Sequence, residues 1–164
     1  MELFQGDLLV TFIRLVAAMG LGLLLGLERI YAHKSAGLRT YALVSMASAL
    51  FIVISEQVAV QYAGMPGFTF DPLRVAAQIV VGVGFLGTGL IIFNNNQVHN
   101  LTTASGLWMC AAIGMACGFG LYMEAIFGTL LAFFVLGVLS IIERRFRVKF
   151  FGTHPEENDG GDKQ

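Results

Sequence analysis

The sequence predicts an all-α membrane protein that crosses the bilayer about five times, and two observations carry this prediction. First, 56% of the 164 residues are hydrophobic and only 13% are charged, with a mean hydropathy of +0.74, whereas a soluble domain has about 25% charged residues. Second, five apolar stretches reach the roughly 20 residues that cross about 30 Å of hydrocarbon. The stretches run approximately from Leu8 to Leu27, Thr40 to Ala59, Pro72 to Phe93, Leu101 to Phe119 and Leu121 to Ile142.

The first stretch contains a charge, Arg14, about two turns or roughly 9 Å into the helix. No cation precedes this stretch and Arg14 interrupts its apolar core, so we expect a retained span and not a cleaved signal peptide. A charge at this depth costs a few kcal/mol unless it snorkels to the surface or pairs. Both alternatives stay open, with Asp71 and Glu124 as the predicted acidic partners.

The start of the third stretch combines an acidic residue with a proline. Asp71 precedes Pro72, which is typical of a helix N-terminus capped by the carboxylate. Arg74 and Gln78 follow at positions i+3 and i+7, so they share one helix face with Asp71. We hypothesise an outer polar cluster made of Arg14, Asp71, Arg74, Gln78 and Glu124.

Glycines are dense in three of the spans. Such residues let helices approach closely in lipid, where hydrophobic drive between helices is small. In the third span they also permit a second interpretation, local unwinding around a hydrated cavity, as in the broken helices of transporters. The glycines in question are Gly22 and Gly26, Gly82, Gly84, Gly87 and Gly89, and Gly114 and Gly118.

The last two spans form one apolar stretch of about forty residues, too long for a single crossing. We place the break where Gly118, Gly120 and Glu124 cluster. Cys110 and Cys117 are two turns apart along one face, about 10 Å, which is too far for a disulfide. We interpret them as small packing residues.

The placement of the cations predicts orientation, because short cytosolic loops collect Lys and Arg. Eight of the ten cations lie in the first loop and the tail, which puts the N-terminus outside and the C-terminus in the cytosol. We expect residues 1–150 to form the transmembrane domain and residues 151–164 a short disordered cytosolic tail. This distribution gives no reason to expect nucleic acid as a partner.

A second set of polar residues gathers at the predicted cytosolic ends of the spans. Ordinary interfacial anchoring and capping explain such residues, and a vestibule facing the cytosol is the alternative. The set comprises Glu28, Arg29, Arg39, Thr40, Thr102 and Thr103, with Asn94, Asn95, Asn96 and Asn100 beside it.

No enzyme motif is present, because the sequence lacks a P-loop, HExxH or GxSxG and its three histidines are scattered over loops and tail. A Mg2+ site needs carboxylates, which Asp71 and Glu124 would supply only if their spans meet. We therefore predict no enzyme activity, no cofactor and no metal site.

Four stretches of the chain resemble the MgtC/SapB family of bacterial inner-membrane proteins. They are GLLLGLER (22–29), AGLRTYALV (36–44), DPLRVAAQIVVGVGFLGTGLI (71–91) and LTTASGLWMCAAIGMACGFGLY (101–122). The resemblance implies five transmembrane helices in a bacterial inner membrane, with the tail in the cytosol. The characteristic polar positions of the family fall on Glu28, Arg29, Arg39, Thr40, Asp71, Arg74, Gln78, Thr102 and Thr103.

The chain departs from the family in two places. The family usually has Gly where this chain has Asn100 before Leu-Thr-Thr. MgtC also has a long cytosolic C-terminal domain, whereas this sequence is similar to the short SapB-type members, so we expect only a short tail after the last span.

The family resemblance implies a role in magnesium or ion homeostasis, low-magnesium growth and virulence. MgtC is described as acting on the F-type ATP synthase and not as a magnesium transporter. We therefore expect a small regulatory or accessory protein, surrounded by membrane lipids, that contacts a partner such as this synthase, and we expect a homodimer. The alternative is an oligomeric ion transporter or channel with a broken third helix.

Overall fold

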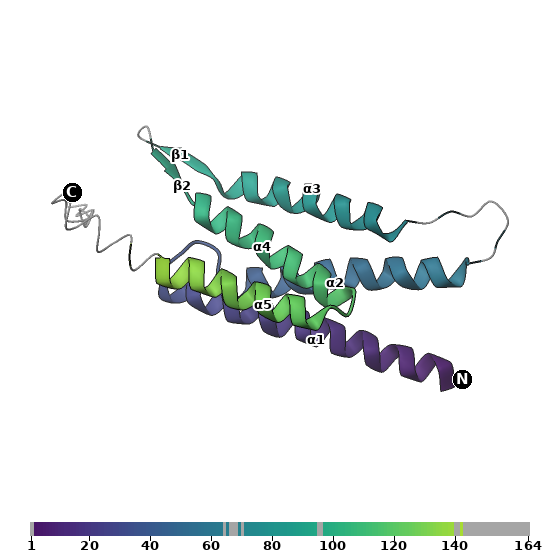
Figure 1. The fold of residues 1–164 in the computed structure, drawn as a ribbon. Helices are drawn as coiled ribbons and strands as arrows, with labels where there is room; N and C mark the ends of the chain where they lie inside the picture. The colour runs from purple at the N-terminus through teal and green to yellow at the C-terminus, as the bar shows by residue number, and fades with distance from the viewer. Residues whose placement is uncertain are drawn as a thin grey trace, which may run out of the picture.

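The computed structural model describes residues 2–63, 65, 69, 71–94, 97–139 and 142, and for residues 2–7 and 72 it describes the backbone alone. The predicted tail at 151–164 lies outside these residues. The chain folds into helices α1 (Glu2–Tyr31), α2 (Leu38–Gln61), α3 (Pro72–Leu90), α4 (Leu101–Gly118) and α5 (Tyr122–Phe133), with α5 continuing as a π-helical segment over Phe134–Leu139 (Figure 1).

The predicted all-α membrane fold is confirmed. Five helices in the described part of the chain are long and apolar enough to cross a bilayer: Leu8–Tyr31, Leu38–Gln61, Leu73–Leu90, Leu101–Gly118 and Tyr122–Leu139. The orientation stays a prediction, and we use it only to name the two ends of the bundle. The outer end holds the N-terminus of α1, and the inner end holds the loop between α1 and α2.

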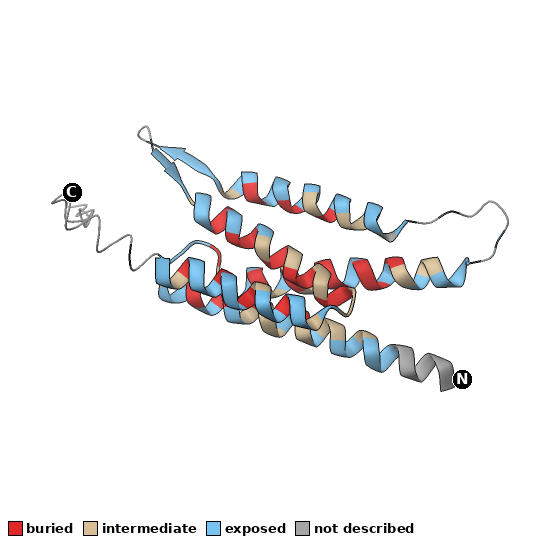
Figure 2. Cartoon of the chain, viewed as in Figure 1, coloured by how far each residue is buried: buried red, intermediate tan, exposed pale blue. Residues whose placement is uncertain are grey.

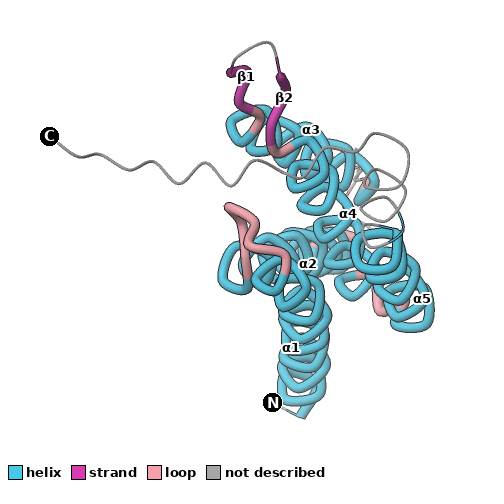
Figure 3. Tube along the Cα trace, turned by 90° about the vertical axis from the view of Figure 1, so that its left-hand side faces the viewer, coloured by secondary structure: helices cyan, strands magenta, loops and turns pink. Residues whose placement is uncertain are grey.

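Helix α4 lies at the centre of the bundle. It contacts each of the other four helices, while α1 and α2 pack closely against each other. Helix α3 lies at one edge, beyond α4, as the view along the bundle shows (Figure 3). Buried residues line the sides of α1, α2 and α4 that face one another, whereas the outward sides are exposed apolar surface (Figure 2). This is the pattern expected of a bundle surrounded by lipid.

The glycines of α1 and α4 set the spacing to α2. A Cβ atom at Gly26 would lie 2.7 Å from the Leu38 Cα, and one at Gly22 would lie 2.8 Å from the Tyr41 carbonyl oxygen. At Gly114 it would overlap the Ser45 carbonyl oxygen, and at Gly118 it would lie 2.8 Å from that of Ala49. These four glycines therefore lie at close helix contacts, where the packing interpretation places them.

The third helix is continuous, so the unwinding that we considered between Gly84 and Gly89 does not occur in this structure. Helix α3 keeps its α-helical backbone from Pro72 to Leu90, and the Thr88 hydroxyl adds a 2.9 Å hydrogen bond to the Gly84 carbonyl. A helix in lipid satisfies its own backbone groups, which opposes unwinding. A Cβ atom at Gly87 would contact Ala104, whereas one at Gly82, Gly84 or Gly89 would meet no atom of another helix within 4 Å.

The third span ends before the predicted Phe93, because the chain turns into a β-hairpin. Strand β1 (Ile92–Asn94) pairs antiparallel with β2 (Gln97–His99). Asn100 follows with a left-handed backbone (φ 64°, ψ 15°) and donates a 3.2 Å hydrogen bond to the Leu90 carbonyl. This conformation favours Gly and, after it, Asn. The departure from the family at this position is therefore conservative in backbone terms.

The turn between α4 and α5 lies where the sequence predicts it. Helix α4 ends at Gly118, and Gly120 takes a positive φ of 77° before α5 begins at Tyr122. A left-handed glycine just past a helix C-terminus is a common stop signal. The two helices therefore pack as antiparallel neighbours.

We predict that Gly114→Ala destabilises the bundle by roughly 1–3 kcal/mol, because the new methyl group would overlap the backbone of α2 and force the helices apart. The matched control is Gly84→Ala, where the methyl group meets open space. The measurement is unfolding in detergent by graded addition of SDS, followed by circular dichroism. Equal midpoints for the two variants would contradict this account of the packing.

Candidate functional site

An ion pair between α1 and α2 lies near the outer end. The Arg14 guanidinium donates from the same nitrogen to the Glu56 carboxylate and, over 2.7 Å, to the Gly118 carbonyl. The side chains of Arg14 and Glu56 are 21% and 34% exposed. The Arg14 guanidinium therefore connects three helices, and Glu56 neutralises the cation in the outer half of the first span.

The predicted outer cluster does not form as a unit, since Arg14 pairs with Glu56 and not with Asp71 or Glu124. Glu56 lies about 7.5 Å from the end of α2, at nearly the same depth as Arg14. That match of depth was the signal in the sequence that could have found it. Asp71 instead accepts a 2.9 Å hydrogen bond from the Leu73 amide and caps α3 as predicted. The remaining members, Arg74, Gln78 and Glu124, are exposed.

The Arg14–Glu56 pair lines a crevice between α1 and α2, with a volume of about 600 Å³. Its walls combine apolar residues such as Leu8 and Val53 with polar ones from both helices. Among the polar ones, the Gln57 amide donates a 3.3 Å hydrogen bond to the Thr11 hydroxyl. Both helices thus contribute polar and apolar side chains to the crevice.

A second ion pair is buried at the inner end. Glu28 and Arg29 are 9% and 1% exposed, and the Arg29 guanidinium contacts the Glu28 carboxylate through two nitrogens. The third guanidinium nitrogen, NH1, is buried without an acceptor among the described residues. Breaking a pair at such a depth leaves an uncompensated charge, which is strongly destabilising.

Tyr41 connects this region to α4. Its hydroxyl donates a 3.3 Å hydrogen bond to the Thr103 carbonyl, and its own carbonyl accepts a 3.1 Å bond from the Cys110 thiol. Gly106 leaves the space for the tyrosine hydroxyl. The Ser45 hydroxyl, one turn further along α2, is buried with no partner among the described residues. Tyr41 carries no charge, and we did not predict it as a site residue.

The inner set of predicted polar residues is therefore divided by burial. Glu28, Arg29 and Thr103 lie in the core, whereas Arg39, Thr40 and Thr102 are exposed. The two cysteines, Cys110 and Cys117, are free and fully buried, as their interpretation as packing residues requires.

The described residues contain no group of three or more His, Cys, Asp or Glu side chains that could hold a metal ion. The described charged residues that are at least partly buried in the bundle include two oppositely charged pairs, one towards each end. The outer pair joins α1 to α2, whereas the inner pair lies within α1, and in both pairs each charge has its counterion, as intramembrane charges require.

A model of the MgtC family matches residues 15–145. The chain belongs to the MgtC family. It is 43% identical over 127 residues to the "Putative magnesium transporter YhiD" of Escherichia coli K12, which covers 77% of this chain and 59% of that protein. It is 40% identical over 137 residues to "Protein MgtC" of Brucella abortus, covering 84% of this chain and 53% of that protein.

An uncharacterized Haemophilus influenzae protein is 35% identical over 144 residues, which is 87% of this chain and 60% of that protein. The chain thus spans between about half and three fifths of the length of these relatives. No solved structure matches it. The matched region begins one residue after Arg14, and it contains Glu56, the inner ion pair, the rest of α1 and the whole of α2 to α5.

The Arg14–Glu56 pair predicts energetic coupling between α1 and α2. We expect Arg14→Met and Glu56→Gln each to lower stability by about 1–3 kcal/mol, less than for a fully buried pair because both groups are partly exposed. The double variant should lose less than the sum of the two. Unfolding by SDS of the parent, the two single variants and the double variant measures the coupling energy in a double-mutant cycle. Glu124→Gln is the control. A loss of stability equal to that of Glu56→Gln would count against Glu56 as the partner of Arg14.

The inner pair predicts a contrast between two arginines of the same predicted loop region. Arg29→Ala should leave Glu28 buried and unpaired, costing about 3–5 kcal/mol, and should greatly reduce the folded protein recovered from membranes. Arg39→Ala removes an exposed charge and should stay within about 0.5 kcal/mol of the parent. Fluorescence-detected size exclusion after mild extraction provides the comparison. Similar losses of folded protein for the two variants would mean that the buried position of Arg29 contributes nothing to stability.

Proposed function

We propose that this MgtC-family chain is a regulatory or accessory membrane protein of magnesium homeostasis, which acts by contacting a membrane partner. The observation that carries the proposal is the closed packing between α1, α2 and α4, where glycines bring backbone against backbone. The charges deepest in these helices are paired within the chain. A closely packed bundle whose deepest charges are paired internally is suited to offering a fixed surface to another protein.

The family supports the magnesium setting of this proposal. The relative in Escherichia coli is named a putative magnesium transporter, and we extend only the magnesium connection to this chain. The F-type ATP synthase of the bacterial inner membrane is the partner that the family resemblance suggests. Its proton-conducting part lies in the same bilayer and offers helices for intramembrane contact.

A transporter that works as an oligomer is the second proposal. It is favoured by the name of the Escherichia coli relative and by the Arg14–Glu56 pair in its crevice, because charges at membrane depth are functional candidates by default. In this proposal the helices of several copies would have to form the path together.

Growth and flux measured on the same protein separate the two proposals. We expect the chain to restore growth at limiting magnesium to a strain that lacks its own copy. In liposomes loaded with a magnesium-sensitive dye, influx should equal that of protein-free liposomes. Influx that rises in proportion to the reconstituted protein would refute the accessory role and favour transport.

The partner is tested by affinity purification from mild detergent, with the Arg29→Ala variant as a misfolded control. We expect subunits of the F-type ATP synthase to co-purify with the parent chain and not with the control. Recovery of no membrane protein above the control would contradict action through a partner.

A further inference from the structure

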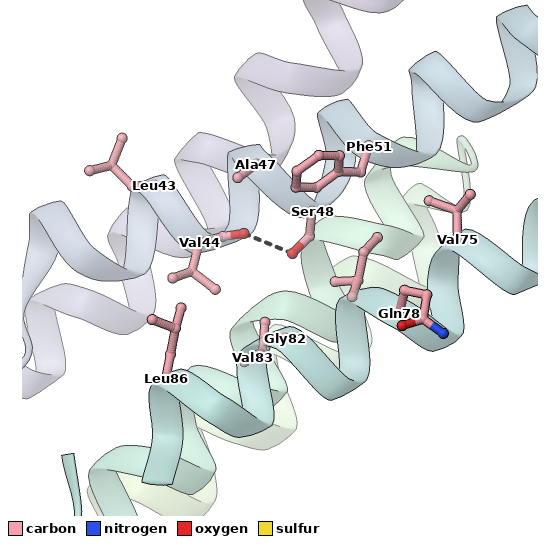
Figure 4. A pocket seen from close by; sticks show the side chains of 11 residues that line it. Leu43, Val44, Ala47, Ser48, Phe51, Val75, Gln78, Gly82, Val83 and Leu86 are labelled. Atoms are coloured by element: carbon pink, nitrogen blue, oxygen red, sulfur yellow. Dashed lines mark hydrogen bonds between the residues drawn. The ribbon is translucent and has the colours of Figure 1, made fainter. Parts of the chain in front are cut away.

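A groove of about 570 Å³ runs between α2 and α3 on the lipid-facing side of the bundle (Figure 4). It exists because α3 packs mainly on α4 and diverges from α2. Leu43 and Phe51 of α2 form one wall, and Gln78, Gly82 and Leu86 of α3 form the other. The groove is apolar except for Gln78 and the Ser48 hydroxyl, which donates to the Val44 carbonyl of its own helix.

The α3 wall has one polar group that lipid does not satisfy. Gln78 is exposed and has no hydrogen-bond partner among the described residues. It lies about 9 Å along the helix from Pro72, inside the hydrocarbon region. An unpaired amide in such surroundings costs several kcal/mol, so a lipid tail is a poor occupant. A second amide is a good one, because each can donate to and accept from the other.

The neighbouring positions of α3 suit a close helix contact. Gly82, one turn beyond Gln78, has no atom within 4 Å of where a Cβ would stand. By contrast, Gly22, Gly26, Gly114 and Gly118 all meet a neighbouring helix. Phe85, on the same side as Gln78, is 79% exposed and projects from the bundle. A glycine lets two helix backbones approach closely, and a large side chain next to it can then pack against the other helix.

The charges at the outer end of α3 complement each other. Asp71 and Arg74 are both exposed and lie one turn apart on the face that leads to Gln78. Two copies inserted in the same orientation are related by a two-fold axis along the membrane normal, so residues near the axis meet their own copies. Arg74 and Asp71 lie one and two turns from Gln78, so where the two crossing helices leave the axis the carboxylate of one copy can face the guanidinium of the other.

We propose that the α2–α3 groove is the interface of a symmetric dimer of this chain. Each α3 lies against the groove of the other copy, the two Gln78 amides pair near the axis, and Phe85 enters the groove. Gly82 permits the approach. This inference does not depend on the proposed function, since an accessory protein and a transporter could both be dimers.

Oxidative crosslinking in native membranes tests the interface. The full chain with Cys110→Ala and Cys117→Ala serves as background, and Gln78→Cys and Gly82→Cys are introduced separately. Both should form disulfide-linked dimers with copper phenanthroline. Leu130→Cys, exposed on α5 at similar depth, is the control and should remain monomeric. Absence of dimer at both α3 positions, or an equal yield at Leu130→Cys, would overturn the proposal.

A photo-crosslinking residue at Phe85 identifies the occupant independently of cysteine chemistry. An adduct of twice the monomer mass that contains only this chain is the expected result. Adducts only with lipid, or only with another membrane protein, would overturn the dimer and identify the groove as a site for that occupant.

The amide pair is tested by energy transfer between labelled copies in vesicles of increasing lipid content. Gln78→Leu keeps the size of the side chain and should raise the dissociation constant of the dimer about three- to tenfold. Gln57→Leu removes an exposed amide from α2 outside the groove and should leave the dissociation constant of the dimer unchanged. Equal dissociation constants for the two variants would refute the pairing of Gln78.

Discussion

The close contact of α2 with α1 and α4 is the constraint on which the rest of the structure depends. In lipid, burial of apolar surface gives helices little reason to associate, so dispersion and interhelical polar contacts must supply the energy. Gly22 and Gly114 admit the α2 backbone from two sides. Once α2 is held there, Tyr41 reaches the Thr103 carbonyl and Glu56 reaches Arg14.

The polar interactions follow from this packing and divide the molecule into two parts. The core of α1, α2 and α4 keeps its charges in internal pairs, one towards each end. Helix α3 instead carries Arg74 and Gln78 on its exposed side. A core with internally paired charges, beside an edge helix with exposed polar side chains, fits the proposal that this MgtC-family chain functions through contacts made at that edge.

Much of the fold could be predicted from sequence because hydropathy and length determine what can cross a bilayer. The turn at Gly120 and the cap at Asp71 are local features, so they too were predictable. The partner of Arg14 was not, because pairing depends on how helices rotate about their axes, which hydropathy leaves open. Glycine density in α3 suggested unwinding, yet a continuous helix forms because nothing else there satisfies its backbone.

The central claim is that the core between α2 and α4 is closed to water, and the two native cysteines test it most directly. Cys110 and Cys117 are both 0% exposed. The account predicts that a small, membrane-permeant thiol reagent leaves both unlabelled in native membranes and labels both after denaturation in SDS. Labelling in native membranes at a rate close to that of Gly84→Cys, an exposed position, would contradict it and indicate a hydrated path through the core.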